Sequence, residues 1–136
     1  MVVSATGGPT NALGLRPGMV VQELGWDADV DEELRHDIMD AIDADLIEEA
    51  EEAVDAVVLW LRDDTDVADG LVDALIDLSD DGYIWLLTPK IGREGYVASA
   101  DLAEGAKTAG MTLASAVEVS KDWSARKVVR PKGARR

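Results

Sequence analysis

The sequence contains no cysteine and no phenylalanine, and His36 is its only histidine. The lack of cysteine excludes disulfides, thiol catalysis and thiolate metal sites, and a single histidine excludes any site built from several imidazoles. No apolar run approaches the roughly 20 residues that a membrane-spanning helix needs. No serine lies in a nucleophile-elbow motif, and no full Gly-x-Gly-x-x-Gly loop is present. We therefore expect no catalytic residues, no metal, no cofactor and no membrane contact.

Charge is spread unevenly along the 136 residues, whose net charge is −15. Residues 23–81 contain 23 acidic residues and only two basic ones, Arg35 and Arg62, whereas residues 82–136 contain ten basic and five acidic ones. Such a field repels nucleic acid over most of the surface, because binding there depends on Lys and Arg neutralising phosphates. A nucleic-acid partner is therefore disfavoured, and we expect a cytoplasmic protein.

The length and composition predict one domain with a modest core. Residues 1–12 are small and polar, which predicts a disordered lead-in. Residues 13–130 are expected to form the domain, and residues 131–136 a basic disordered tail. The tail either attracts a polyanion or simply keeps the chain in solution.

Apolar runs alternate with helical patterns, which indicates βαβ units and a mainly parallel sheet. Strands are predicted at 19–24, 56–61, 83–87, 111–119 and 126–129. The apolar run 56–61, "AVVLWL", is typical of a central strand buried on both faces. The connection between the last two strands is too short for a helix, so we expect that pair to be antiparallel.

Helices are predicted from near Val30, over 67–78, and from Ser99 to Gly110. In the first, Asp29 and Glu32 form a capping-box pattern, and an apolar residue recurs at every fourth position. The acidic segment 45–55 is expected to continue or restart this helix. Residues 80–82, Asp-Asp-Gly, predict a turn, and Ser99 is expected to cap the last helix.

Four stretches carry a family resemblance: "GMVVQELGWD" (18–27), "VLWLRDD" (58–64), "DGYIWLLTPK" (81–90) and "DWSARKVVRPK" (122–132). On these residues the chain resembles the actinobacterial family called domain of unknown function 3052. More distantly, its element order is similar to a degenerate class I S-adenosylmethionine-dependent methyltransferase. The resemblance implies an α/β, Rossmann-like, three-layer fold. The sheet would have about five mostly parallel strands and an antiparallel C-terminal edge strand. It implies no established activity.

The crevice outside the carboxyl ends of parallel strands is the default ligand site of such a sheet. Methyltransferases place several glycines after the first strand there, whereas this chain has Gly25 followed by Trp26, whose indole is expected to occupy the cofactor space. The residues expected at this crevice are Gly25, Trp26, Asp27, Arg62, Asp63, Pro89, Lys90, Ser124 and Arg126. Arg62 and Lys90 either hold a small anionic ligand or pair with neighbouring acids.

Carboxylates between residues 27 and 55 form the strongest feature of the sequence. "DADVDEELRHDI" begins like a calcium loop but has Glu32 where that loop needs glycine, so no specific Ca²⁺ site is predicted. The segment is either a solvated face or a docking surface for a basic protein. That candidate docking surface comprises Glu32, Glu33, Asp37, Asp40, Glu48, Glu49, Glu51 and Glu52. The basic C-terminal part could lie against it within the chain or across a homodimer.

These patterns lead to two main functional hypotheses, besides a third in which the basic tail binds nucleic acid. The first is a non-catalytic binding or regulatory protein that acts through the acidic surface, the crevice, or both. The alternative is a small-molecule binder for a nucleotide derivative, or a residual S-adenosylmethionine-dependent methyltransferase.

Overall fold

The computed structural model describes residues 13–131. The predicted lead-in, residues 1–12, and all but the first residue of the predicted tail lie outside the described residues. The described elements, in chain order, are β2 (Val21–Leu24), α1 (Glu32–Ile42), β3 (Val54–Trp60), α2 (Val67–Leu75), β4 (Leu78–Pro89), α3 (Ser99–Thr108), β5 (Thr112–Val117) and β6 (Trp123–Val129).

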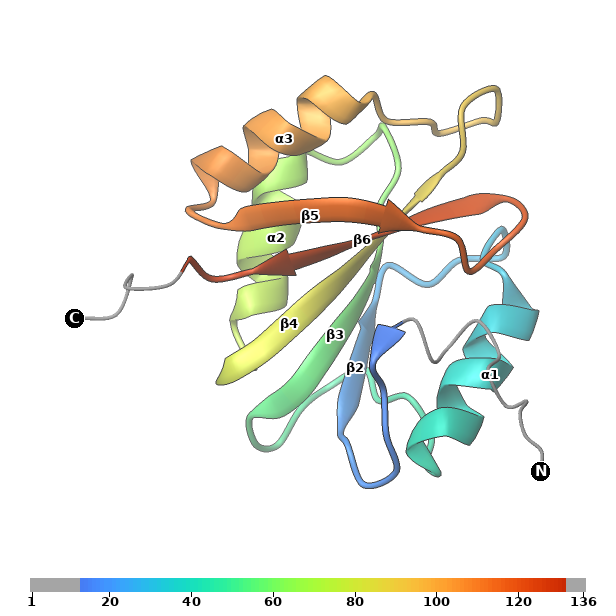
Figure 1. The fold of residues 1–136 in the computed structure, drawn as a ribbon, viewed down its shortest axis with the longest axis vertical. Helices are drawn as coiled ribbons and strands as arrows, with labels where there is room; N and C mark the ends of the chain where they lie inside the picture. The colour runs from blue at the N-terminus through green and yellow to red at the C-terminus, as the bar shows by residue number, and fades with distance from the viewer. Residues whose placement is uncertain (1–12, 132–136) are drawn as a thin grey trace.

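The strands form one five-stranded sheet in the order β2-β3-β4-β6-β5 (Figure 1). β2, β3 and β4 are mutually parallel, and β6 runs antiparallel to both of its neighbours. The prediction of an antiparallel final pair is confirmed. The order of this pair in the sheet differs from the prediction. β6 lies between β4 and β5, so β5 and not the C-terminal strand is at the edge.

Helices cover both faces of the sheet, as the three-layer prediction requires. α1 packs its buried stripe of Leu34, Ile38 and Ile42 on one face, and α2 and α3 lie on the other (Figure 1). β3 alternates between the two cores, with Val58 on the α1 side and Val57 on the α2 side. Both side chains are fully buried, which confirms that the run at 56–61 is a central strand.

The acidic segment after α1 is not helical, so the prediction of a second helix at 45–55 is wrong. α1 ends at Ile42, and the C-cap residue Asp43 adopts a left-handed φ of 58°. Like charges three and four residues apart disfavour a helix over the following glutamates. The chain instead runs beside β2, where Ile47 accepts from the Glu23 N–H (2.7 Å) and donates its own N–H to the Val21 carbonyl (3.1 Å).

Three predicted boundaries also shift. Asp31, not Asp29, caps α1, because its carboxylate accepts the Leu34 N–H. Ser99 is the first helical residue of α3, and the N-cap Ala98 makes no side-chain bond. The predicted turn at 80–82 is part of β4, which begins at Leu78 and absorbs the extra residues as an irregularity in its pairing with β3.

Candidate functional site

The carboxyl ends of the three parallel strands meet at one edge of the sheet, where Arg62 links two of them. Its Nη1 donates to the carbonyl of Gly25 after β2 (2.9 Å) and more weakly to that of Trp60 at the end of β3 (3.3 Å). Its Nε donates to Asp29 Oδ2 at 2.9 Å. The guanidinium is therefore held at the crevice by the chain itself, which agrees with the alternative that Arg62 pairs with a neighbouring acid.

Gly25 allows the main chains at the ends of β2 and β3 to lie close together. Its φ is +80°, and a Cβ added there would lie 2.2 Å from the Trp60 carbonyl oxygen. A side chain would therefore separate the ends of β2 and β3. Conformational freedom and close approach both explain the glycine without any ligand.

Trp123, at the start of β6, closes the same edge from the α1 side. It is buried, and its ring packs edge-on against that of Trp60, with centroids 4.9 Å apart. The Arg62 guanidinium carbon lies 5.2 Å from the centre of the Trp123 ring, within cation–π range. The indole N–H donates to the Asp29 carbonyl at 3.2 Å. Arg62 and Trp123 thus pack on each other at this edge and bond to the main chain of Gly25 and Asp29.

A methyltransferase cofactor needs open backbone after the first strand. Here the Gly25 carbonyl already accepts from Arg62, and the Gly25 Cα lies against the Trp60 carbonyl. The residues at this edge therefore do not fit S-adenosylmethionine in that manner.

The position of Trp26 differs from the prediction that its indole occupies the crevice. It is 49% exposed, and its N–H donates to Glu32 Oε2 at 3.2 Å. It lies beside an open hollow of about 530 Å³ that is lined by Glu23, Trp26, Arg35, Leu46 and Glu48. Arg62 and Trp123, not Trp26, pack together at the Gly25 end of the crevice.

Sequence reasoning missed an ion pair in this hollow, between the buried Glu23 and the half-buried Arg35. Glu23, the only buried carboxylate among the described residues, accepts from Arg35 Nε (2.6 Å), Arg35 Nη2 (2.7 Å) and the Trp60 indole N–H (2.9 Å). Glu23 raises the pKa of Arg35, so the guanidinium stays charged. An acid that interrupts an apolar strand was the one available signal, since such a group is buried only with partners.

Ser120 was missed as well. Its hydroxyl donates to Asp31 Oδ2 (2.6 Å) and accepts the N–H groups of Asp122 and Trp123. It therefore ties the β5–β6 loop to the N-terminus of α1 and supports the position of Trp123.

The other residues expected at the crevice spread over a wider area. Lys90 Nζ pairs with Glu118 at 2.9 Å, and the Arg126 Nε donates to the Ala114 carbonyl of β5, away from the Gly25 end. Ser124 pairs with Thr88 next to Pro89 in the β4–β6 ladder. Asp27 is exposed. The structure thus brings Gly25 and Arg62 together but not the full predicted set.

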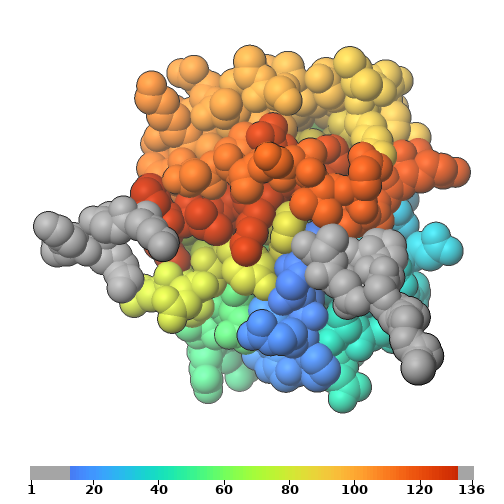
Figure 2. Space-filling view, viewed as in Figure 1, coloured from blue at the N-terminus to red at the C-terminus, as the bar shows by residue number. Residues whose placement is uncertain are grey.

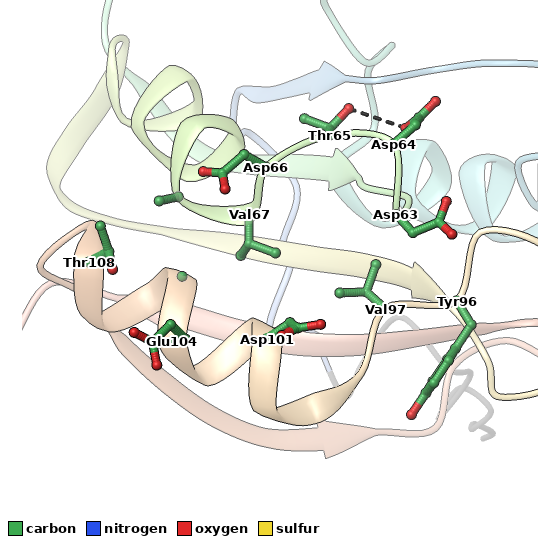
Figure 3. Close-up of a pocket in the computed structure, with 12 residues that line it drawn as sticks. Asp63, Asp64, Thr65, Asp66, Val67, Tyr96, Val97, Asp101, Glu104 and Thr108 are labelled. Atoms are coloured by element: carbon green, nitrogen blue, oxygen red, sulfur yellow. Dashed lines mark hydrogen bonds between the residues drawn. The ribbon is translucent and has the colours of Figure 1, made fainter.

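Asp63 belongs instead to a pocket of about 420 Å³ between α2 and α3 (Figure 3). Its N–H donates to the Gly95 carbonyl. The carboxylates in the lining are those of Asp63, Asp64, Asp66, Asp101 and Glu104. Within residues 13–131, no group of three or more such side chains is arranged to hold a metal ion. No helix of this part of the chain is long and apolar enough to span a membrane.

The candidate docking surface is largely open to solvent. Asp37 is partly buried, and the other seven carboxylates are exposed. Glu32 pairs with Arg35 at 2.9 Å, which lowers the Glu32 pKa. The remaining acids of this surface have no ion pair among residues 13–131, so their field reaches the solvent.

The Asp29–Arg62 pair predicts a pH dependence of stability. The hydrogen bond from Arg62 lowers the pKa of Asp29 below its ordinary value of 3.8. Its stabilising contribution is therefore complete above pH 3.8 and is lost as the pH falls through the lower, folded-state pKa. In urea unfolding, Asp29→Asn should be less stable than the wild type at pH 6, and the gap should close below the folded-state pKa. A gap that stays constant down to pH 2 would contradict this.

A model of the family described as "Protein of unknown function (DUF3052)" matches residues 10–132. Mycobacterial proteins are 43% identical over 122 residues, which is 88% of this chain and 77% of theirs. They include the uncharacterized proteins Rv2239c of Mycobacterium tuberculosis and Mb2263c of Mycobacterium bovis.

Solved structures share the fold at low identity. A Thermoplasma acidophilum protein with a provisional methyltransferase assignment has a TM-score of 0.62 at 11% identity, over 89% of this chain and 72% of that one. The Synechocystis magnesium protoporphyrin IX methyltransferase ChlM, with bound SAM, has a TM-score of 0.55 at 11% identity, over 89% and 74%. A SAM-dependent methyltransferase from Aquifex aeolicus has a TM-score of 0.53 at 15% identity, over 89% of each chain. These similarities confirm the Rossmann-like methyltransferase fold and do not by themselves transfer activity.

Proposed function

Because this chain belongs to the DUF3052 family of unknown function and has a methyltransferase-like fold, we propose that it is a non-catalytic cytoplasmic binding protein. Its partner would be a basic protein that docks on the acidic surface defined above. The observation that carries the proposal is the crevice, where Arg62 bonds to the Gly25 carbonyl and packs on Trp123.

The contacts within the crevice support a binding role for this protein rather than a catalytic one. A catalytic site needs a reactive group within reach of a bound substrate. At this edge Arg62 bonds to Asp29 and Lys90 to Glu118, so the cations that could hold a small anion already have partners. The small-anion alternative is therefore less well supported than protein docking.

The acidic surface supports a basic partner. Residues 23–81 hold most of the acids of a chain with net charge −15, and a concentrated field speeds encounter with an opposite charge. The half-exposed indole of Trp26 lies at the N-terminal end of α1, where its N–H donates to the Glu32 carboxylate. Tryptophan is enriched among the residues that dominate interface energies.

Charge removal tests the docking surface. A fluorescein-labelled peptide rich in lysine and arginine serves as the probe, with polarisation read at 50 and 300 mM NaCl. Neutralising the four glutamates Glu48, Glu49, Glu51 and Glu52 to glutamine should weaken binding about tenfold at low salt and reduce the salt dependence.

The matched control removes the same charge from exposed sites outside the surface, by changing Asp73, Asp80, Asp81 and Asp101 to asparagine. The control should bind nearly as well as the wild type. If both variants bind the peptide equally weakly, the peptide responds only to net charge and the docking surface is refuted.

Thermal unfolding with S-adenosylmethionine or S-adenosylhomocysteine tests the alternative function. Since the residues at the crevice do not fit the cofactor, submillimolar ligand should leave the melting temperature unchanged. A rise of several degrees would show binding to the folded state and would favour the residual methyltransferase.

A further inference from the structure

We propose that the hollow beside Trp26 receives an arginine side chain of the basic protein partner, with the guanidinium against the indole and paired with Glu48. This inference rests on the proposed docking function and deepens it. The hollow lies within the acidic docking surface, because Glu48 lines it and Glu32 bonds to Trp26. It would decide which cation that surface prefers.

Three separate segments of the chain build the hollow. Trp26 follows β2, Arg35 is on α1, and Leu46 and Glu48 belong to the segment that runs beside β2. Figure 2 shows residues of α1 at the surface on the right-hand side of the molecule. The hollow measures about 530 Å³, within the range of roughly 300–1,000 Å³ that is typical of ligand pockets. The fold therefore forms a pocket here and not merely a row of acids along one helix.

Hydrogen bonds hold two sides of the hollow in place. The Trp26 N–H donates to Glu32 Oε2 at 3.2 Å, which fixes the indole beside α1. On the other side, the Gln22 side chain donates to the Glu48 carbonyl at 3.0 Å, and Ile47 bonds to β2 through both its N–H and its carbonyl. A site that is already ordered loses less conformational freedom when a ligand binds.

The face of the Trp26 ring is available to a cation. The bond to Glu32 uses the edge of the indole, and the residue is 49% exposed. The aromatic and cation–π contacts among residues 13–131 involve the other three tryptophans and Tyr83, and none involves Trp26. Among aromatic side chains, the indole attracts a cation most strongly.

The charges around the hollow favour a cation over an anion. Three carboxylates border it, those of Glu23, Glu32 and Glu48, against the single cation Arg35. Arg35 already donates to Glu23 through two nitrogens and to Glu32 through the third. Glu48 has no ion pair within residues 13–131, so its carboxylate can accept from a guanidinium. A phosphate or carboxylate ligand would meet an excess of negative charge.

Arginine fits these groups better than lysine. A planar guanidinium can stack on an indole and donate to a carboxylate from its edge at the same time, whereas an ammonium is a compact, strongly hydrated point charge. The half-buried Leu46 offers the methylene stem an apolar contact. The hollow would thus turn a general attraction for positive charge into a preference for arginine.

Two matched peptides test this preference. Both are labelled with fluorescein and differ only in having arginine or lysine at every basic position, and polarisation at 50 mM NaCl gives both dissociation constants. The wild type should bind the arginine peptide about fivefold more tightly than the lysine peptide. Trp26→Leu should bring this ratio close to one, mainly by weakening the arginine peptide. Trp26→Phe keeps a ring and should retain part of the preference.

Tyr96→Leu is the control, because Tyr96 is also partly exposed and lines the acidic pocket between α2 and α3. This change removes an aromatic ring beside carboxylates at another place, and the arginine preference should equal that of the wild type. NMR locates the contact. The arginine peptide should shift the Trp26 indole N–H signal, identified by its absence in Trp26→Leu, more than the signals of the other three tryptophans.

Four results would overturn the proposal: equal binding of the two peptides by the wild type, a preference that survives in Trp26→Leu, an equal loss of preference in Tyr96→Leu, or no binding of either peptide. Neutralising Glu49, Glu51 and Glu52 to glutamine tests the docking surface separately, since these residues do not line the hollow. This triple variant should weaken both peptides by a similar factor and leave the arginine preference unchanged.

The two proposals can therefore fail independently. Equal binding of both peptides by the wild type, with a loss of both in the triple variant, would keep the docking surface and refute the arginine site. Unchanged binding in the triple variant, with the preference lost in Trp26→Leu, would support the arginine site and refute the wider docking surface.

Discussion

Replacing Gly25 by alanine is expected to lower the free energy of unfolding by about 3–5 kcal/mol. Two effects combine: a non-glycine residue at φ +80° is strained, and its Cβ would meet the Trp60 carbonyl oxygen at 2.2 Å. The oxygen belongs to the backbone of β3, so the clash is relieved only by moving the strand ends apart. Urea or guanidinium unfolding measures the loss, which is a large part of the 5–15 kcal/mol that ordinary domains possess.

Gly92→Ala separates the two effects. Gly92 also has a positive φ, +89°, but no atom lies within 4 Å of the added Cβ. Gly92→Ala should lower the free energy of unfolding only by the cost of the strained backbone, about 1–2 kcal/mol. Equal losses at the two positions would mean that the close approach of β2 and β3 does not explain Gly25.

Glu23→Ala is expected to lower the free energy of unfolding by about 2–4 kcal/mol, because it removes the buried partner of the half-buried Arg35 and leaves the Trp60 N–H without its acceptor. Arg35 would lose its bidentate acceptor, and the buried Trp60 indole N–H would lose the carboxylate that accepts it at 2.9 Å. Glu32, 2.9 Å from Arg35 Nη1, is exposed and cannot replace a buried carboxylate. Denaturant unfolding at neutral pH measures the change.

The control is Glu118→Ala, which breaks the exposed pair with Lys90 and should cost about 0–1 kcal/mol. A double variant with Arg35→Ala should lose less free energy of unfolding than the sum of the two single variants, because each single change already removes the interaction that the two residues share. Losses of unfolding free energy that add up, or a loss for Glu23→Ala close to that for Glu118→Ala, would show that the Glu23–Arg35 pair contributes little to stability.

The prediction of the fold succeeded where burial shows in the local pattern. The apolar run at 56–61 is typical of a strand covered on both faces, and the spacing of Leu34, Ile38 and Ile42 is typical of one helix that faces a core. It failed where long-range pairing competes with local preference. Asp80-Asp81-Gly82 looks like a turn, but β4 continues through it because β3 lies alongside from Val54 onward.

The candidate site was only partly predictable for the same reason. The edge of the sheet and the proximity of Gly25 and Arg62 followed from strands that end together. The role of Trp123 did not, since it lies 63 residues beyond Trp60 and reaches it only after β6 inserts beside β4.

By itself, the sequence determined the alternation of strands and helices, the central strand, the family and the concentration of acid in residues 23–81. These properties depend on side-chain periodicity and composition, which are local. Only the tertiary structure decided which groups pack at the crevice, which acid is buried and which strand lies at the edge of the sheet. Each of these depends on the partner that a residue meets across the sheet, and residues far apart in the chain provide that partner.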